Sequence, residues 1–123
     1  MVYYAPFERM ILRGLVQFAP EFSSILESMI ARLEDQMEIF KNHYKHPGFL
    51  GSNSLKRVLP VLVPALTYED LNVQGGSDAQ AIWEQMILST DGREKSRFAD
   101  DLRAYCEMDT LAMVEIHKAL HQL

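Results

Sequence analysis

The sequence predicts a mainly α-helical protein, with about five to six helices and one short N-terminal strand. Apolar residues recur at helical spacing along most of the 123 residues, and prolines or paired glycines divide that pattern into segments. Only one short run has the composition of a strand. With 48% hydrophobic and 24% charged residues, the chain has a globular balance, and its length suits a single domain.

The first segment, Met1–Ala5, is apolar and aromatic and predicts a strand that belongs to a larger sheet. Proline is favoured in a first helical turn, so a helix is expected to begin at Pro6 and to end before Pro20. Glu21–Asn42 then predicts one longer amphipathic helix, closed by the stop signal Lys45–Gly48. Its expected apolar face consists of Ile25, Met29, Leu33, Met37 and Phe40.

The middle of the chain predicts shorter elements. Phe49–Asn53 is expected to be a loop, followed by a helix over Leu55–Leu59 that Pro60 and Pro64 keep short. Thr67–Leu71 is ambiguous between a turn and a brief helix. Ala79–Ser89 predicts a helix in which Trp83 is expected to lie in the core rather than to stack on a nucleic-acid base.

Asp91-Gly92 marks a turn, and Glu94–Gln122 then runs without proline or glycine. This pattern predicts one long helix or two nearly continuous ones. The expected buried face consists of Phe98, Leu102, Tyr105, Met108 or Asp109, Ala112, Ile116 and Leu120.

Charge and cysteine content narrow the function classes. A formal net charge of −5 argues against a nucleic-acid binder that relies on a broad basic surface, although metal ions can supply positive charge at a phosphate site. The single cysteine, Cys106, excludes an intramolecular disulfide. Neither a signal peptide nor a long apolar run is present, so we expect a cytoplasmic protein without a membrane partner.

Tyr105 and Asp109 are the strongest functional candidates that the sequence offers. They are four residues apart and therefore share one face of the last predicted helix. A carboxylate can hold a divalent metal while a neighbouring phenol orients a water molecule. The commoner explanation of such a pair is a tyrosine at the edge of the core beside a solvated aspartate.

Three stretches carry a family resemblance. Tyr105 and Asp109, with three residues between them, are similar to the last motif of the DEDD-type 3′–5′ exonucleases in their tyrosine variety. Val2–Glu8 resembles the second motif, a strand leading into a helix, with Tyr4 where that motif often has asparagine. Gly51–Pro60 resembles the segment that follows the helical insert. The whole run resembles an uncharacterised bacterial family, domain of unknown function 2779, which looks like a ribonuclease-H-like exonuclease relative.

The resemblance implies a ribonuclease-H-like α/β fold for the intact parent domain, of which this chain is the C-terminal portion. It also implies metal-dependent 3′–5′ exonucleolysis of DNA or RNA. Glu8 and Asp109 would be ligands of Mg²⁺ or Mn²⁺, and Tyr105 would orient the attacking water. The Asp-x-Glu pair of the first strand is absent from this chain. We therefore expect the chain alone to hold magnesium poorly or not at all and to be inactive.

A non-catalytic helical interaction module is the alternative. A fragment without most of its sheet would expose the apolar side of Val2–Tyr4 and of its helices, so we expect self-association or an upstream partner segment. Lys56 and Arg57 could contact a phosphate backbone, although a solvated basic turn is commoner.

The remaining reactive side chains predict little chemistry. His117 and His121 are four residues apart and could share a metal, but no further ligand shares their face. We prefer the explanation that these histidines are favourable here because cationic groups interact well with the negative end of a helix, its C-terminus. His43 and His46 are expected to be exposed. Cys106 lies in a stretch that looks buried and has no group nearby that would activate it.

Overall fold

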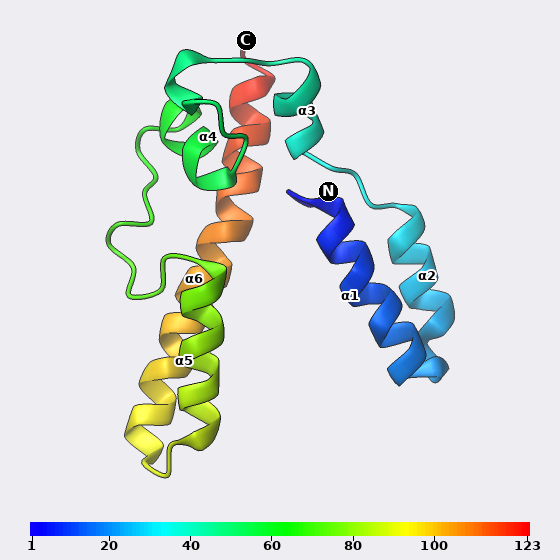
Figure 1. Ribbon diagram of the computed structural model, residues 1–123, viewed down its shortest axis with the longest axis vertical. Coiled ribbons are helices and arrows are strands. Elements are labelled where there is room, and N and C mark those ends of the chain that lie inside the picture. The colour runs from blue at the N-terminus through cyan, green and yellow to red at the C-terminus, as the bar shows by residue number, and fades with distance from the viewer. The chain divides into compact units, whose positions relative to one another are not determined.

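The computed structural model describes residues 1–123, and it is mainly helical, with no strands (Figure 1). The predicted helical class is therefore confirmed. The chain divides into two compact units, Met1–Arg57 and Val58–Leu123. None of the helices combines the length and the hydrophobicity needed to span a membrane.

The first unit begins with a helical hairpin. Helix α1 (Ala5–Phe18) is followed by a short 3₁₀ turn, η1 (Pro20–Phe22), and then by α2 (Ser23–Ala31), which runs back alongside α1 (Figure 1). Pro6 lies in the first turn of α1 and Pro20 follows its end, as the sequence predicts. Two shorter elements complete the unit, α3 (Met37–Asn42) and η2 (Pro47–Phe49).

The predicted continuous helix over Glu21–Asn42 is wrong, because α2 ends at Ala31 and α3 begins only at Met37. Between them the chain pairs with the N-terminal segment. The Val2 backbone N–H donates to the Glu34 carbonyl at 2.8 Å, and the Gln36 N–H donates to the Val2 carbonyl at 2.9 Å. These bonds replace the helical ones, and no proline or glycine marks the break in the sequence.

The predicted strand over Met1–Ala5 is also wrong. The segment forms only one isolated parallel bridge, between Val2 and Asp35. A strand needs neighbouring strands to complete its backbone hydrogen bonds, and this structure contains none.

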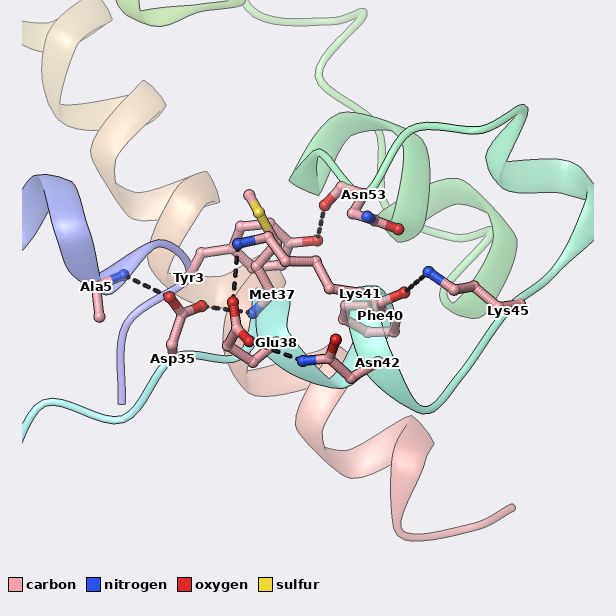
Figure 2. Close-up of polar contacts among 10 residues, drawn as sticks. All are labelled: Tyr3, Ala5, Asp35, Met37, Glu38, Phe40, Lys41, Asn42, Lys45 and Asn53. Carbon is pink, nitrogen blue, oxygen red and sulfur yellow. Dashed lines mark hydrogen bonds and ion pairs between the residues drawn. The ribbon is translucent and has the colours of Figure 1, made fainter.

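Asp35 organises the first unit by accepting hydrogen bonds at the starts of two helices (Figure 2). Its Oδ2 accepts from the Ala5 N–H at 3.1 Å, at the start of α1. Its Oδ1 accepts from the Met37 N–H at 2.9 Å, at the start of α3. First-turn N–H groups have no partner within their own helix, so one carboxylate satisfies donors from segments that are distant in sequence.

Aromatic rings form the core beside this carboxylate. Phe40 of α3 is fully buried, with its ring centroid 6.3 Å from that of Tyr3 and 5.7 Å from that of Phe49. The Tyr3 hydroxyl donates to the Asn53 carbonyl at 2.6 Å, and the Lys45 ammonium donates to the Phe40 carbonyl at 2.7 Å (Figure 2). The N-terminal residues are thereby tied to the chain around residues 40–53.

The hairpin α1–α2 contributes less to this core. The predicted apolar face that ends in buried Phe40 begins with exposed residues, since Ile25 is 64% exposed and Met29 is 42% exposed. On α1, Phe18 is 87% exposed and Met10 is 60% exposed. Several large apolar side chains of the first unit therefore face solvent in this chain.

The second unit is built on a second hairpin, α5 (Gly76–Leu88) and α6 (Gly92–Leu120), whose helices lie side by side (Figure 1). The Asp91 carboxylate caps α6 by accepting from the Arg93 N–H at 2.8 Å. The Ser89 hydroxyl donates to the Glu94 carboxylate at 2.6 Å, which fixes the connecting turn. The long C-terminal segment is thus a single helix.

Helix α4 (Leu55–Leu62) precedes this hairpin and is longer than predicted, because Pro60 lies inside it rather than at its end. Val58 and Leu59 of α4 are fully buried, as are Ala112 and Ile116 of the predicted α6 face. The prediction that Trp83 lies in the core is wrong. Its side chain is 52% exposed on α5, because a helix packed against one partner buries only one face.

Candidate functional site

The candidate site lies around Asp109, in the middle of α6. Tyr105 and Asp109 are both half-buried and lie one turn apart on this helix. Their shared face therefore follows from local geometry, as the sequence predicts. What the carboxylate contacts is decided by another segment.

That segment is the loop between α4 and α5, which contributes Tyr68. Tyr68 is buried, with 8% of its surface exposed, and its hydroxyl donates to Asp109 Oδ1 at 2.6 Å. Its ring centroid lies 6.3 Å from that of Tyr105, with the planes inclined at 53°. Asp109 thus lies next to two tyrosines, and one of them bonds directly to its carboxylate.

Tyr68 is not among the site residues that the sequence predicts, because Thr67–Leu71 is ambiguous between a turn and a brief helix. The structure shows a turn in which the Thr67 hydroxyl accepts from the Glu69 N–H at 3.1 Å. The available signal was a large aromatic residue among polar neighbours, which is typical of a loop that packs onto a core. Its partner, 41 residues away, had no signal in the sequence.

A second bond anchors the same loop farther along α6. The Asn72 side-chain amide donates to Asp101 Oδ1 at 2.9 Å, and Val73 beside it is fully buried. Asp101 and Asp109 are eight residues apart, or about 12 Å along a helix, and share the face that carries Tyr105. The loop is thus held to this face at two points.

The electrostatics of the site keep the Tyr105 phenol protonated. Burial raises the pKa of Tyr105 to about 12, and the negative charge of Asp109 acts in the same direction. Asp78, in the first turn of α5, adds a smaller contribution of the same sign. At neutral pH the Tyr105 hydroxyl is therefore available as a hydrogen-bond donor.

The other predicted site residues belong to other elements. Glu8 is half-buried in the first turn of α1, within the first unit. Lys56 and Arg57 are exposed in the first turn of α4. The structure brings Tyr105 and Asp109 together, whereas the roles assigned to Glu8, Lys56 and Arg57 stay predictions.

The fit of a divalent metal can be judged from the side chains around Asp109. No three His, Cys, Asp or Glu side chains gather closely enough to hold a metal ion. One oxygen of Asp109 already accepts the Tyr68 hydroxyl. Mg²⁺ is held by several oxygen ligands in near-octahedral geometry, so Asp109 would supply only part of such a ligand set.

The exposure of Cys106 differs from what the sequence predicts. The stretch around it looks buried, but its side chain is exposed. On a helix the residue after Tyr105 is turned about 100° away from it, so the buried face that includes Tyr105 excludes Cys106.

The N-terminal part of this chain is similar to a known protein family. The family described as "Domain of unknown function (DUF2779)" matches residues 1–54. This range nearly coincides with the first compact unit and includes Glu8 and Asp35. The predicted resemblance is supported over this range, and the residues around Asp109 lie outside it.

Two curated proteins are similar over nearly all of the chain. The "Uncharacterized protein UU173" of Ureaplasma parvum serovar 3 is 26% identical over an alignment of 141 positions, which covers 100% of this chain and 20% of the relative. The "Uncharacterized protein MG366 homolog" of Mycoplasma pneumoniae is 29% identical over an alignment of 129 positions, covering 94% and 19%. The chain thus spans about a fifth of the length of these relatives. No solved structure matches it.

Proposed function

We propose that this chain is the C-terminal portion of an exonuclease-like domain in a longer cytoplasmic protein. That protein hydrolyses DNA or RNA from the 3′ end in a reaction that depends on Mg²⁺ or Mn²⁺. The observation that carries the proposal is the arrangement on α6, where Asp109 lies one turn from Tyr105 and accepts a hydrogen bond from buried Tyr68.

Three features support this assignment. A half-buried carboxylate held by a tyrosine hydroxyl has a fixed direction, which a reactive site requires. The raised pKa of Tyr105 keeps its phenol able to donate a hydrogen bond to a water molecule or a phosphate oxygen. Both residues match the last motif of the exonucleases that the chain resembles.

In this proposal the chain supplies only part of the site. Asp109 and Glu8 contribute two acids, and the remaining acidic residues come from other parts of the longer protein. The isolated chain is therefore inactive as a nuclease. Lys56 and Arg57, exposed at the start of α4, add positive charge suited to a phosphate backbone.

The test uses the full-length protein, assayed for release of nucleotides from labelled DNA and RNA with Mg²⁺ or Mn²⁺. Asp109→Ala should abolish the activity, and Tyr105→Phe should lower it at least tenfold. Unchanged activity in Asp109→Ala contradicts the proposal.

Asp101→Ala is the matched control for that assay. Asp101 lies on the same face of α6 and also accepts a hydrogen bond from the loop between α4 and α5. If only the attachment of this loop matters, both aspartate variants lose activity equally. If Asp109 is part of the reactive site, Asp101→Ala retains most of the activity.

A specific observation also favours a second candidate, a non-catalytic interaction module that self-associates or binds an upstream segment. Large apolar side chains are exposed where α1 and α2 meet, including Phe18 at 87%, Phe22 at 55% and Ile25 at 64%. Exposed apolar clusters are typical of surfaces that become covered in an assembly. Full-length protein without nuclease activity but with stable self-association would favour this candidate.

A further inference from the structure

The last turn of α6 brings two histidines together in a way that the function proposed above does not use. His117 Nε2 and His121 Nε2 lie 3.1 Å apart, and both side chains are exposed. The ring centroids are 4.5 Å apart and the ring planes are nearly perpendicular, at 85°. The two Nε2 atoms are thus within hydrogen-bond distance of each other, and which of them donates depends on the tautomer of each ring.

This convergence has the dimensions of a chelate. Zinc binds imidazole nitrogen at about 2.0–2.1 Å, so two nitrogens 3.1 Å apart would subtend an angle of about 100° at the ion. That angle lies between the roughly 90° of square-planar geometry and the roughly 109° of tetrahedral geometry. A metal would replace the hydrogen bond between the rings, with the proton of each neutral imidazole on Nδ1.

The surroundings also suit a cation. The pair lies at the C-terminus of a 29-residue helix, where unpaired carbonyl groups create a negative end. The basic side chain that follows His117 in sequence, Lys118, forms an ion pair with Glu115 at 2.7 Å, which offsets its charge. No other lysine or arginine follows His117 in the sequence.

We propose that His117 and His121 form a bidentate surface site for a transition-metal dication of the class that prefers imidazole, namely Cu²⁺, Ni²⁺ or Zn²⁺. The remaining coordination positions are open to water or to a ligand from a bound molecule. The site is separate from the carboxylate chemistry proposed for Asp109, because His117 lies eight residues farther along α6, or about 12 Å.

The first experiment titrates Cu²⁺, Ni²⁺, Zn²⁺ and Mg²⁺ separately into the 123-residue chain and follows binding by calorimetry. One Cu²⁺ should bind per chain, more tightly than Ni²⁺ or Zn²⁺, with no binding of Mg²⁺ to the pair. His117→Ala and His121→Ala should each weaken Cu²⁺ binding at least tenfold. Unchanged binding in either variant overturns the proposal.

A register variant separates chelation from the mere presence of two histidines. The double substitution His121→Gln, Gln122→His keeps the number of imidazoles but moves one of them about 100° around the helix axis. It should bind Cu²⁺ as weakly as His121→Ala. Equal binding by this variant and the parent chain overturns the proposal.

Two further variants locate the site. His43→Ala, His46→Ala removes the two exposed histidines of the first unit and should leave Cu²⁺ binding unchanged. Loss of Cu²⁺ binding in this double variant would assign the metal to His43 and His46 instead. Asp109→Ala should bind Cu²⁺ as tightly as the parent chain does. A failure of the histidine site can therefore be distinguished from a failure of the nuclease assignment. Circular dichroism of each variant verifies that α6 is retained.

Discussion

At the scale of single residues, the environment of Asp109 depends on one hydroxyl group. The Tyr68 hydroxyl donates to Asp109 Oδ1 at 2.6 Å from a buried ring. A hydrogen bond to a charged acceptor is stronger than one between neutral groups, and its loss leaves a partly desolvated oxygen without that donor. Tyr68 therefore contributes both to stability and to the direction of the carboxylate.

Tyr68→Phe should lower the free energy of unfolding by about 1–2 kcal/mol, because it removes this donor while preserving the packed ring. Urea denaturation followed by circular dichroism measures the effect. Tyr44→Phe is the matched control, since the Tyr44 ring packs against Phe40 and Phe49 but its hydroxyl forms no hydrogen bond. Equal losses in the two variants would show that the Tyr68–Asp109 bond contributes little.

The Tyr105 phenol affects the stability of the folded chain at alkaline pH. Its pKa in the folded chain is raised from 10.0 to about 12, first by burial and then by the charge of Asp109. Because the folded state resists deprotonation more than the unfolded state, the stabilisation is complete below about pH 10 and is lost as the pH rises through about 12. Tyr105→Phe should therefore lose less stability than the parent chain over this range.

The measurement compares urea midpoints at about pH 9 and about pH 11.5 for the parent chain and the variant. Burial also raises the pKa of Tyr3, so part of the alkaline loss should persist in Tyr105→Phe. Asp109→Asn should reduce the loss as well, because it removes the negative charge beside Tyr105. An alkaline loss in Tyr105→Phe as large as that of the parent chain would contradict the assignment.

At the scale of secondary-structure elements, carboxylates determine where several helices begin. Asp91 caps α6 from the adjacent residue, which is a local interaction. Asp35 instead caps α1 and α3 together, and its bond to the Ala5 N–H joins residues 30 apart in sequence. One side chain therefore couples the start of the first hairpin to the aromatic core around Phe40.

Asp35→Ala should lower the free energy of unfolding by about 1–2 kcal/mol, because it removes the side-chain acceptor of the Ala5 N–H and one of the two acceptors of the Met37 N–H, which also donates to the Tyr3 carbonyl at 3.0 Å. Asp35→Asn should cost about half as much, since its amide retains one acceptor oxygen. Chemical denaturation measures both. Glu34→Ala, an exposed neighbour whose side chain caps no helix, should change stability by less than about 0.5 kcal/mol. A loss in Asp35→Ala no larger than in Glu34→Ala would rule out the double cap.

At the scale of the whole molecule, the family match and the candidate site fall in different compact units. The family match covers residues 1–54, within the first unit, whereas Tyr105 and Asp109 lie in the second. The first unit also carries the exposed apolar side chains at the junction of α1 and α2. Those side chains support the proposal that the chain associates with another copy or with an upstream segment.

The chain should self-associate as its concentration rises, because burial of this apolar surface releases about 25 cal/mol per Å². Sedimentation velocity over a hundredfold concentration range measures the change. Phe18→Ser, Ile25→Ser should shift the chain toward monomer. Leu88→Ser is the control, since Leu88 is 80% exposed but lies in the second unit. Equal effects of the two changes would show that association is not specific to α1 and α2.

Much of the helical architecture could be predicted because its signals are local. Prolines bracket α1, Asp91 starts α6, and the buried face of α6 follows its apolar spacing. The break between α2 and α3 could not be predicted in this way, because Arg32–Gln36 contains only residues that a helix accepts. It depends on backbone bonds to Val2, about thirty residues earlier.

The candidate site likewise combines a relation that the sequence predicts with contacts that it does not predict. The sequence alone determined that Tyr105 and Asp109 share a helix face, because that relation depends on residues four apart. Only the tertiary structure decided that Tyr68 bonds to Asp109 and that Asp35 caps two helices, since these pairs are 41 and 30 residues apart. Helical periodicity fixes relations within a few turns, whereas contacts between distant segments depend on how the chain packs.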